Sequence, residues 1–273
     1  MASIERTAYP QFKRNPVVRE LVVAYTPTDA ELTFIADNAR QPGHRLILAI
    51  LLKSFQRLGY FPAIDEVPAG VIRHLRNALR FRVQIKPADI APNKRYRYFQ
   101  RIRAYLQVRA YADGGLDVAA RAIHEAAAVM DNPADLINVA IEQLVRDRIE
   151  LPAFSALDRL ARRVRTLVNG RYFALIDKRL TADEKQRLDD LLVVTDARIK
   201  SPLQAIKRLP KRSSLQHFQE LLDHIAALDE LVGSERHLAD VPELKRKHFA
   251  AEARVLDAAE LRDFGPAKRH ALL

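Results

Sequence analysis

The chain of 273 residues contains no cysteine, so disulfide bonds, thiolate nucleophiles and the cysteine ligands of zinc fingers are excluded. It also lacks a phosphate-cradling glycine loop and a nucleophile elbow, and no histidine is followed by arginine at the spacing of a tyrosine recombinase. Adjacent acids such as Asp189 and Asp190 project to different faces of a helix, which argues against a carboxylate site. We therefore predict that this chain is not itself an enzyme and holds no catalytic residue.

Long apolar runs are also missing. The N-terminus has no apolar segment of the kind that a signal peptide needs, and the longest apolar run, Leu46 to Leu52, is too short to cross a bilayer. We expect a cytoplasmic protein that does not contact a membrane. His217, Glu220 and His224 share one face of an expected helix, which can hold a metal, but exposed polar residues are the simpler account. We predict no metal site and no cofactor in this chain.

Charge is abundant and unevenly distributed. The formal net charge is +11, from 45 basic and 34 acidic residues. Acids outnumber bases between residues 113 and 150, whereas Arg73 to Lys86, Lys94 to Arg109, Arg159 to Arg179 and Arg198 to Arg212 are basic clusters. Because a chain charged only for solubility would mix its signs more evenly, the clusters favour a polyanionic partner, and nucleic acid is the first candidate.

The spacing of apolar residues predicts an all-α fold. Residues His44 to Leu58 are apolar almost all round, as in a buried central helix, after a break at Pro42 and Gly43. Thr28, Thr181 and Ser214 are placed as helix N-caps. Only Phe81 to Lys86 alternates apolar and polar residues, which predicts a short strand or wing. The fold class we expect is tandem small helical modules, similar to helix-turn-helix units, followed by a further helical region.

A faint internal repeat supports the helix-turn-helix interpretation. Pro62-Ala63 and Pro152-Ala153 each follow an apolar helix that ends in a basic residue, and each precedes a helix with an arginine-rich outer face. In helix-turn-helix proteins the second helix enters the major groove of DNA. The second such helix has Ser155 as its expected N-cap, with Leu157, Leu160, Ala161, Val164, Leu167 and Val168 on its core face. A solvated arginine face on an ordinary amphipathic helix is the alternative.

The basic faces supply the residues that we predict to bind DNA. The tyrosines between Asn93 and Tyr111 are expected to pack in the core rather than stack on bases, with the neighbouring arginines turned outward. For the connector before Ser214, a solvated linker and phosphate contact are equally open. The predicted residues are Arg73, His74, Arg76, Asn77 and Arg80, then Arg97, Arg101 and Arg103, then Arg159, Arg162, Arg163 and Arg165, and lastly Lys207, Arg208, Lys211 and Arg212.

Five long stretches carry a resemblance to a known family: Glu5 to Pro16, Phe55 to Pro62, Tyr98 to Arg109, Asn132 to Arg165 and His248 to Arg269. They resemble the N-terminal region of a bacterial replicative, cointegrate-forming transposase of the Tn-three type. The resemblance implies a helical region that binds terminal inverted repeats, ahead of a DDE catalytic core that uses acidic residues and magnesium. We expect this chain to end before that core, so magnesium is implied only for the missing part.

Three domains are expected on this basis. Residues 1–112 form a first DNA-binding module with an N-terminal arm, 113–180 a second, helix-turn-helix-like module, and 181–273 a third helical region truncated before the core. The expected partner is double-stranded DNA at transposon ends, with self-association in a transposition complex left open. Two alternatives remain: a truncated regulator that occupies transposon ends without cutting them, and a generic helical nucleic-acid-binding or adaptor protein.

Overall fold

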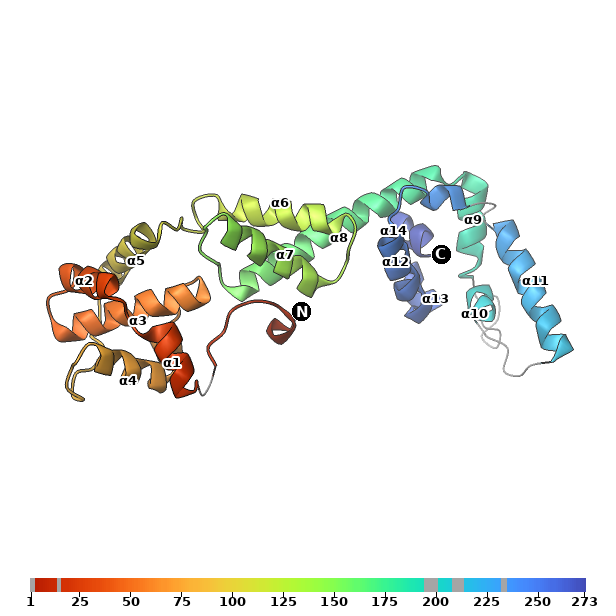
Figure 1. Cartoon of the computed structure of the whole chain (residues 1–273). Coiled ribbons are helices and arrows are strands. Elements are labelled where there is room, and N and C mark those ends of the chain that lie inside the picture. The colour runs from red at the N-terminus through yellow and green to blue at the C-terminus, as the bar shows by residue number, and fades with distance from the viewer. Residues whose placement is uncertain (1–2, 14–15, 194–200, 208–213, 232–234) are drawn as a thin grey trace. The chain divides into compact units, whose positions relative to one another are not determined.

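The computed structural model describes residues 3–13, 16–193, 201–207, 214–231 and 235–273. These residues form α-helices and short 3-10 helices with no β-strand, so the all-α prediction is confirmed (Figure 1). The chain divides into two compact units. Unit 1 comprises Met1–Ala122 and Ile137–Leu160, and unit 2 comprises Ile123–Leu136 and Ala161–Leu273. The division into three domains stays a prediction.

The helices follow one another closely along the chain. Unit 1 contains α1 (Val18–Tyr25), α2 (Asp29–Asn38), α3 (Pro42–Leu58), α4 (Ala69–Ala78) and α5 (Pro92–Leu106). The boundary between the units falls within α6 (Gly115–Ala127), α7 (Pro133–Arg146) and α8 (Phe154–Arg179). Unit 2 contains α9 (Ala182–Asp190), α10 (Pro202–Ile206), α11 (Leu215–Leu231), α12 (Glu243–Val255), α13 (Ala258–Arg262) and α14 (Pro266–Leu272). No helix in the described part of the chain is long and apolar enough to span a membrane.

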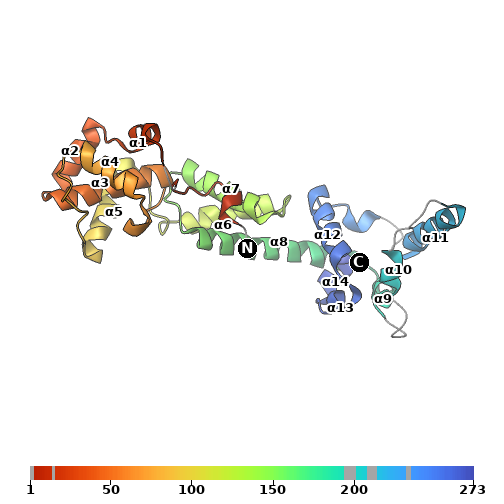
Figure 2. The same ribbon diagram turned by 90° about the horizontal axis from the view of Figure 1, so that it is seen from below.

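Helix α3 is the centre of unit 1, as the sequence predicts. Every residue from Leu46 to Phe55 is buried, and α1, α2, α4 and α5 all pack against this helix (Figure 2). The sequence predicts that Pro42 and Gly43 interrupt the helix before them. In the structure they are the first two residues of α3. Proline is tolerated there because the first-turn N–H groups have no partner within a helix. Gly59 ends α3 with φ of 75°, in the left-handed region that glycine adopts freely.

Helix α1 lies where the sequence predicted only an N-terminal arm. Tyr25 is buried, and Leu21 and Ala24 pack against the core of unit 1, so this helix covers α3 and α4. Val18 and Val23 lie on its outer side and are 76% and 79% exposed. With only eight residues, α1 is too short for its apolar spacing to predict a helix from the sequence alone.

Residues 81–86 form no strand, so the predicted strand or wing is wrong. The segment turns instead, with the Ile85 N–H donating to the Arg82 carbonyl at 3.0 Å. The carbonyl of Ile85 accepts a 2.8 Å hydrogen bond from Nε of Arg76. An alternating pattern forms a strand only when a neighbouring strand supplies backbone hydrogen bonds. Here the side chain of Arg76, not a neighbouring strand, binds the Ile85 carbonyl.

Three helices of unit 1 end on a residue with positive φ that is not glycine. In each case the next residue donates its N–H to a carbonyl one helical turn back, as in a Schellman motif. The left-handed conformation costs such a residue about 1 kcal/mol relative to glycine. The residues are Arg80 (φ 56°), Gln107 (φ 55°) and Arg148 (φ 52°), followed by the bonds Phe81 to Arg76, Val108 to Arg103 and Ile149 to Leu144.

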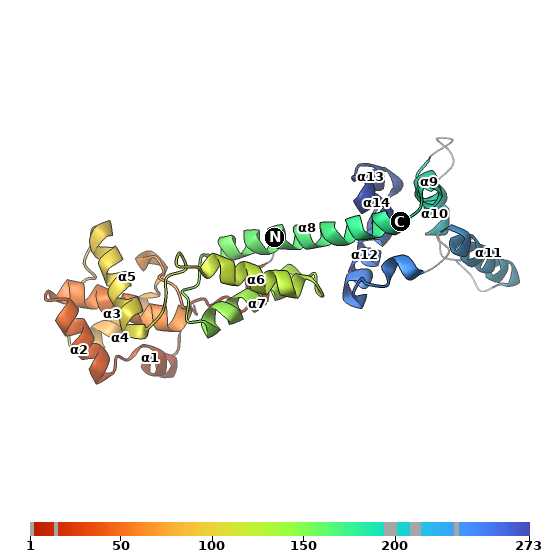
Figure 3. The same cartoon turned by 90° about the horizontal axis from the view of Figure 1, so that it is seen from above.

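In unit 2 the C-terminal part of α8 lines a second core, in which Phe173 and Ile176 pack with Leu188, Phe249 and Leu261. Figure 3 draws α8 as one uninterrupted helix. It begins at Phe154, so the prediction that Ser155 is its N-cap is wrong by two residues. The predicted caps of α2, α9 and α11 are confirmed, because the hydroxyls of Thr28, Thr181 and Ser214 each accept an N–H three residues on.

Charged groups are buried inside this second core. Lys245 is fully buried and donates to Asp131 at 2.6 Å and to Asn169 at 2.7 Å. The same Asp131 carboxylate accepts from Asn169 at 2.8 Å and lies 2.8 Å from Nε2 of His248. Because each buried charge has several partners, the network joins α8, α12 and the segment before α7.

A second polar cluster holds α14 in place. The ring of the buried His270 lies 2.6 Å from an Asp177 oxygen and 3.2 Å from an Asp189 oxygen. Arg269 binds Asp189 through two nitrogens, at 2.8 and 3.1 Å. Burial opposes ionisation of both aspartates, but the hydrogen bonds from His270 and from Lys185 or Arg269 outweigh it and lower their pKa values.

Candidate nucleic-acid interface

The outer face of α8 carries two exposed arginines of the predicted set, Arg159 and Arg163. Leu157, Ala161 and Val164 are buried on the inner side, as predicted. Arg159 and Arg163 lie on the opposite side, one turn or about 6 Å apart along the axis, and both are exposed. Neither makes a hydrogen bond or ion pair with a described residue. Their guanidinium groups are therefore available to an external anion.

Other residues of α8 depart from the prediction. Leu167, placed on the core face, is 59% exposed, while Leu160 is half-buried. Arg162 is also half-buried. Arg165 has a nitrogen 3.5 Å from an oxygen of the buried Asp131, so its charge is partly used inside unit 2. Exposure on this helix thus ranks Arg159 and Arg163 above Arg162 and Arg165 as DNA contacts.

Helix α4 presents a shorter basic face. Val71 and Leu75 are fully buried, and Arg73 and Asn77 lie on the exposed side at a spacing of one turn. Arginine can bind the edge of guanine and asparagine the edge of adenine, each through two hydrogen bonds. Arg80 is also exposed, at the left-handed position that ends the helix.

Two predicted residues of α4 contribute to the fold. Nε2 of His74 lies 2.9 Å from the Thr26 hydroxyl, which ties α4 to the end of α1. Burial lowers the pKa of His74, so its ring is neutral at pH 7. Nε of Arg76 is used by the Ile85 carbonyl. Neither side chain is fully available to a ligand.

In α5 the prediction that Arg103 turns outward is wrong. Nε of Arg103 lies 2.7 Å from Oε2 of Glu150, and the arginine side chain is only 16% exposed. Its guanidinium also lies 5.3 Å from the ring centre of Phe61, which stacks on Phe99. Burial raises the pKa of Glu150 in spite of this arginine. Arg103 is thus paired inside unit 1.

The rest of α5 agrees better with the sequence analysis. Tyr98 is buried in the core as expected, whereas Tyr105 stacks on Phe34 but is 37% exposed, so the core prediction is wrong for Tyr105. Arg97 is exposed and makes no contact with a described residue, whereas Arg101 donates to the Asn38 carbonyl at 3.3 Å. Figure 1 shows α4 and α5 on opposite sides of α3.

The four basic residues predicted in the connector before Ser214 divide into one described residue, Lys207, and three others. Nζ of Lys207 donates to the carbonyls of Ala253 and Leu256, at 2.5 and 2.6 Å, where α12 ends. Burial lowers the pKa of Lys207. This lysine satisfies carbonyls that have no partner within the helix, which is a structural role. Arg208, Lys211 and Arg212 lie outside the described residues.

Three basic residues of α8 lie outside the predicted set: Arg171, Lys178 and Arg179. Arg171 is exposed, and its guanidinium lies 2.9 Å from Nε2 of His124. The cluster from Arg159 to Arg179 was the signal that could have included it. Among the described residues, no group of three or more acids and histidines is placed to hold a metal ion.

The turns of the faint repeat are longer than expected. Residues 59–68 separate α3 from α4, and residues 147–153 separate α7 from α8. Typical helix-turn-helix motifs use three or four residues. The two turns meet, since the Leu151 N–H donates to the Gly59 carbonyl at 2.8 Å. The turns thus brace each other inside unit 1.

Comparison with known proteins finds one matching family model and several transposases that are similar to this chain. Residues 1–164 match the family described as "Domain of unknown function (DUF4158)". The transposase for transposon Tn501 of Pseudomonas aeruginosa is 26% identical over 268 residues, which cover 93% of this chain and 26% of the relative. The transposase for transposon Tn3926 of Escherichia coli is 26% identical over 259 residues, with the same two shares. The transposase for transposon Tn1546 of Enterococcus faecium is 20% identical over 280 residues.

The chain spans about a quarter of the length of the curated relatives that it matches. The matches extend over almost all of the chain and so reach well beyond residue 164. They confirm the resemblance to the N-terminal region of Tn-three-type transposases that the sequence predicts.

Proposed function

Because the chain belongs to the DUF4158 family and resembles transposases over most of its length, we propose that it binds double-stranded DNA at transposon terminal inverted repeats. In this proposal it acts in transposition as the N-terminal part of a DDE transposase. It carries out no cleavage or strand transfer itself, and any magnesium belongs to a catalytic core outside this chain. The observation that carries the proposal is the exposed arginine face of α8.

The shape of α8 suits the major groove. That groove is about 12 Å wide and admits an α-helix with its side chains. Arg159 and Arg163 project from one side of α8. Further along the helix, the same side carries Gly170, and a Cβ atom added to this glycine would have no neighbouring atom within 4 Å. A low, open surface beside two arginines lets the helix approach base edges closely. Two forked guanidinium groups one turn apart then bind successive base pairs.

Exposed residues of α4 and α5 have further roles in the proposal. Arg73 and Asn77 of α4 form a second pair of base-reading candidates, and Arg97 of α5 is placed to bind phosphate. Phosphate contacts orient a protein on the duplex but carry little sequence information. Binding should therefore weaken steeply as the salt concentration rises.

Selection from a library of random-sequence duplexes tests the proposal. We expect one extended sequence to be enriched. In competition at physiological salt, the chain should prefer that sequence to a scrambled duplex by roughly a thousandfold or more. A generic nucleic-acid-binding protein would enrich no sequence and would bind both duplexes equally.

Substitutions in α8 then locate the interface. Arg159→Ala and Arg163→Ala should each weaken binding to the enriched duplex by about 1 to 3 kcal/mol if they read bases. If they bind only phosphate, affinity for every duplex should fall equally. Arg146→Ala is the control, because Arg146 is equally exposed but pairs with Glu142 in the acidic part of the sequence. Unchanged affinity in both test variants would remove α8 from the interface.

A further inference from the structure

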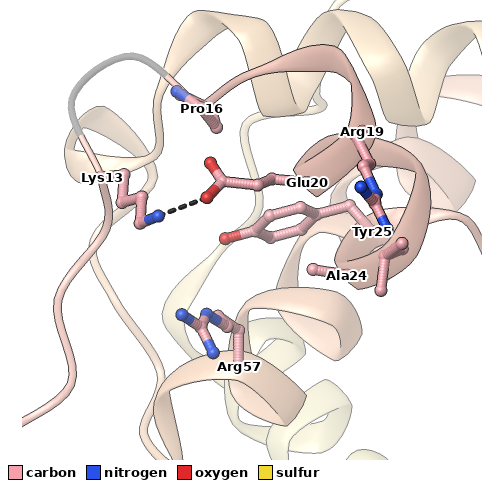
Figure 4. Close-up of a pocket in the computed structure, with 8 residues that line it drawn as sticks. Lys13, Pro16, Arg19, Glu20, Ala24, Tyr25 and Arg57 are labelled. Carbon is pink, nitrogen blue, oxygen red and sulfur yellow. Dashed lines mark hydrogen bonds and ion pairs between the residues drawn. The ribbon is translucent and has the colours of Figure 1, made fainter.

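A pocket of about 390 Å³ lies in unit 1 between α1 and the last turn of α3 (Figure 4). Lys13 reaches it from the N-terminal segment, Arg19 and Glu20 from α1, and Arg57 from α3. None of these residues belongs to the predicted DNA-binding set. The volume falls in the range of pockets that hold small organic ligands, about 300 to 1,000 Å³.

The charges around the pocket favour an anion. Three cations face one carboxylate, and that carboxylate, Glu20, is already bound by Lys13. The hydrogen bond from Lys13 lowers the pKa of Glu20, and the charge of Arg57 adds to the effect. Arg19 and Arg57 make no hydrogen bond or ion pair with a described residue. Two guanidinium groups therefore remain without a partner at one small site.

A tyrosine hydroxyl also opens onto this pocket (Figure 4). Tyr25 is only 5% exposed, and its hydroxyl makes no hydrogen bond with a described residue. Tyr9 and Tyr60 in the same unit behave differently, since their hydroxyls donate to backbone carbonyls at 2.8 and 3.2 Å. The Tyr25 hydroxyl is therefore available to donate to an acceptor oxygen bound in the pocket. Burial raises the pKa of Tyr25, so the hydroxyl keeps its proton and can donate.

We propose that this pocket binds the phosphate group of a nucleotide. Arg57 and Lys13 bind the phosphate oxygens, and the Tyr25 hydroxyl donates to one of them. Guanidinium forks and a hydroxyl around one point suit a tetrahedral anion with several acceptor oxygens. Ala24, together with the exposed Val23 at the rim, gives the pocket an apolar side that packs against the attached sugar. The phosphate comes either from a free nucleotide or from the backbone of a DNA strand, and the second source rests on the proposed DNA binding.

Substitution of Glu20 should strengthen phosphate binding rather than weaken it. When the pocket is empty its carboxylate holds Lys13, so an entering phosphate competes with Glu20 for that ammonium group. Glu20→Gln removes the competing negative charge and releases Lys13. The amide oxygen can still accept the Val17 N–H, as Oε2 of Glu20 does now at the start of α1. This substitution should therefore tighten phosphate binding, an effect that a purely structural role would not produce.

Calorimetric titration of the full chain with inorganic phosphate and with deoxyadenosine monophosphate tests the proposal. Arg57→Gln should weaken binding about tenfold or more, because a hydrogen bond between two charged groups is lost. Tyr25→Phe should weaken it severalfold without lowering the melting temperature, since no internal hydrogen bond is removed. The matched controls are Arg40→Gln and Tyr105→Phe, which lie outside the pocket in the same unit. Neither control should change the affinity.

A duplex of fixed sequence separates the two sources. If backbone phosphate occupies the pocket, Arg57→Gln should weaken duplex binding and reduce its logarithmic salt slope by about one. If only free nucleotide occupies it, duplex affinity should stay unchanged while nucleotide affinity falls. The proposal is overturned if the wild-type chain binds neither small ligand saturably and Arg57→Gln leaves duplex affinity unaltered. An absence of sequence preference in the wild type would contradict the DNA-end proposal and leave this one standing.

Discussion

The two units of this chain are held together in different ways. The core of unit 1 surrounds α3, in which the ten residues from Leu46 to Phe55 are all buried and mostly apolar. Unit 2 has polar and charged side chains inside its core, among them His270 and Lys245. Apolar burial adds up over many small contacts, whereas a buried charge depends on a few specific partners. Removing one partner of a buried charge should therefore lower the free energy of unfolding of unit 2 more than substituting an exposed residue lowers that of unit 1.

Among its described residues, unit 1 has the buried ion pair of Lys53 with Glu31 at 3.2 Å, which joins the neighbouring helices α2 and α3, and the largely buried pair of Arg103 with Glu150 at 2.7 Å. The pairs of unit 2 join segments much further apart in the sequence, such as Asp131 with Lys245 and Asp177 with His270. The polar networks of unit 2 thus fix its tertiary arrangement.

The largest effect is expected for Lys245→Ala. This change leaves the buried Asp131 without its closest cation and should cost about 3 to 5 kcal/mol in the free energy of unfolding. Urea denaturation followed by circular dichroism measures it. Lys247→Ala is the control, since Lys247 pairs with Glu243 on the surface and should cost under about 1 kcal/mol. Equal costs for the two variants would show that the buried pair does not hold unit 2 together.

Leu48→Ala should have the next largest effect, in unit 1. Leu48 is fully buried in α3, so the change leaves a cavity and should cost about 2 to 5 kcal/mol. Val18→Ala, at a site 76% exposed, should cost under about 0.5 kcal/mol. The cost should be the same at pH 7 and pH 5, because no charge is involved. A cost below about 1 kcal/mol for Leu48→Ala would contradict the central role of α3.

Acid should weaken unit 2 through Asp177 and Asp189. Both pKa values are lowered in the folded state, so these aspartates contribute stability above the unfolded pKa and lose it as pH falls through the folded one. The loss should begin near pH 4, close to the usual pKa of aspartate, and continue below it. Melting temperatures of the wild type and of Asp177→Asn between pH 6 and pH 3 measure it. The variant should be less stable at pH 6 and flatter in its pH dependence, and parallel curves would contradict the assignment.

The smallest effect on stability is expected for Arg80→Gly. Glycine adopts the left-handed conformation at this position without strain, so the free energy of unfolding should change by about 1 kcal/mol or less. Duplex affinity should nevertheless fall, because an exposed charge of the proposed interface is lost. Thermal unfolding and duplex titration of one preparation measure both. A large loss of stability would show that the Arg80 side chain supports the fold rather than DNA binding.

The sequence predicts features that depend on neighbours along the chain. The buried central helix and the caps at Thr28 and Thr181 follow from local spacing and are present, whereas the inner face of α8 is buried only in part, since Leu167 is exposed. Arg103 was predicted wrongly because its partner, Glu150, is distant in the sequence. No local pattern indicates that Lys245 is fully buried beside Asp131.

The pocket beside α1 was missed for a related reason. Its charged residues come from three separate segments of the chain. The sequence predicts an N-terminal arm where α1 lies. Only folding brings Lys13, Tyr25 and Arg57 together. Sites of this kind are found from structure and then tested by substitution.

The most direct test of the proposed function is competition at physiological salt between the selected duplex and a scrambled duplex of the same length and composition. We predict a preference of roughly a thousandfold or more for the selected duplex, and a large loss of that preference in the Arg159→Ala, Arg163→Ala double variant. Equal affinity of the wild-type chain for the two duplexes would contradict the proposal that this chain recognises transposon ends.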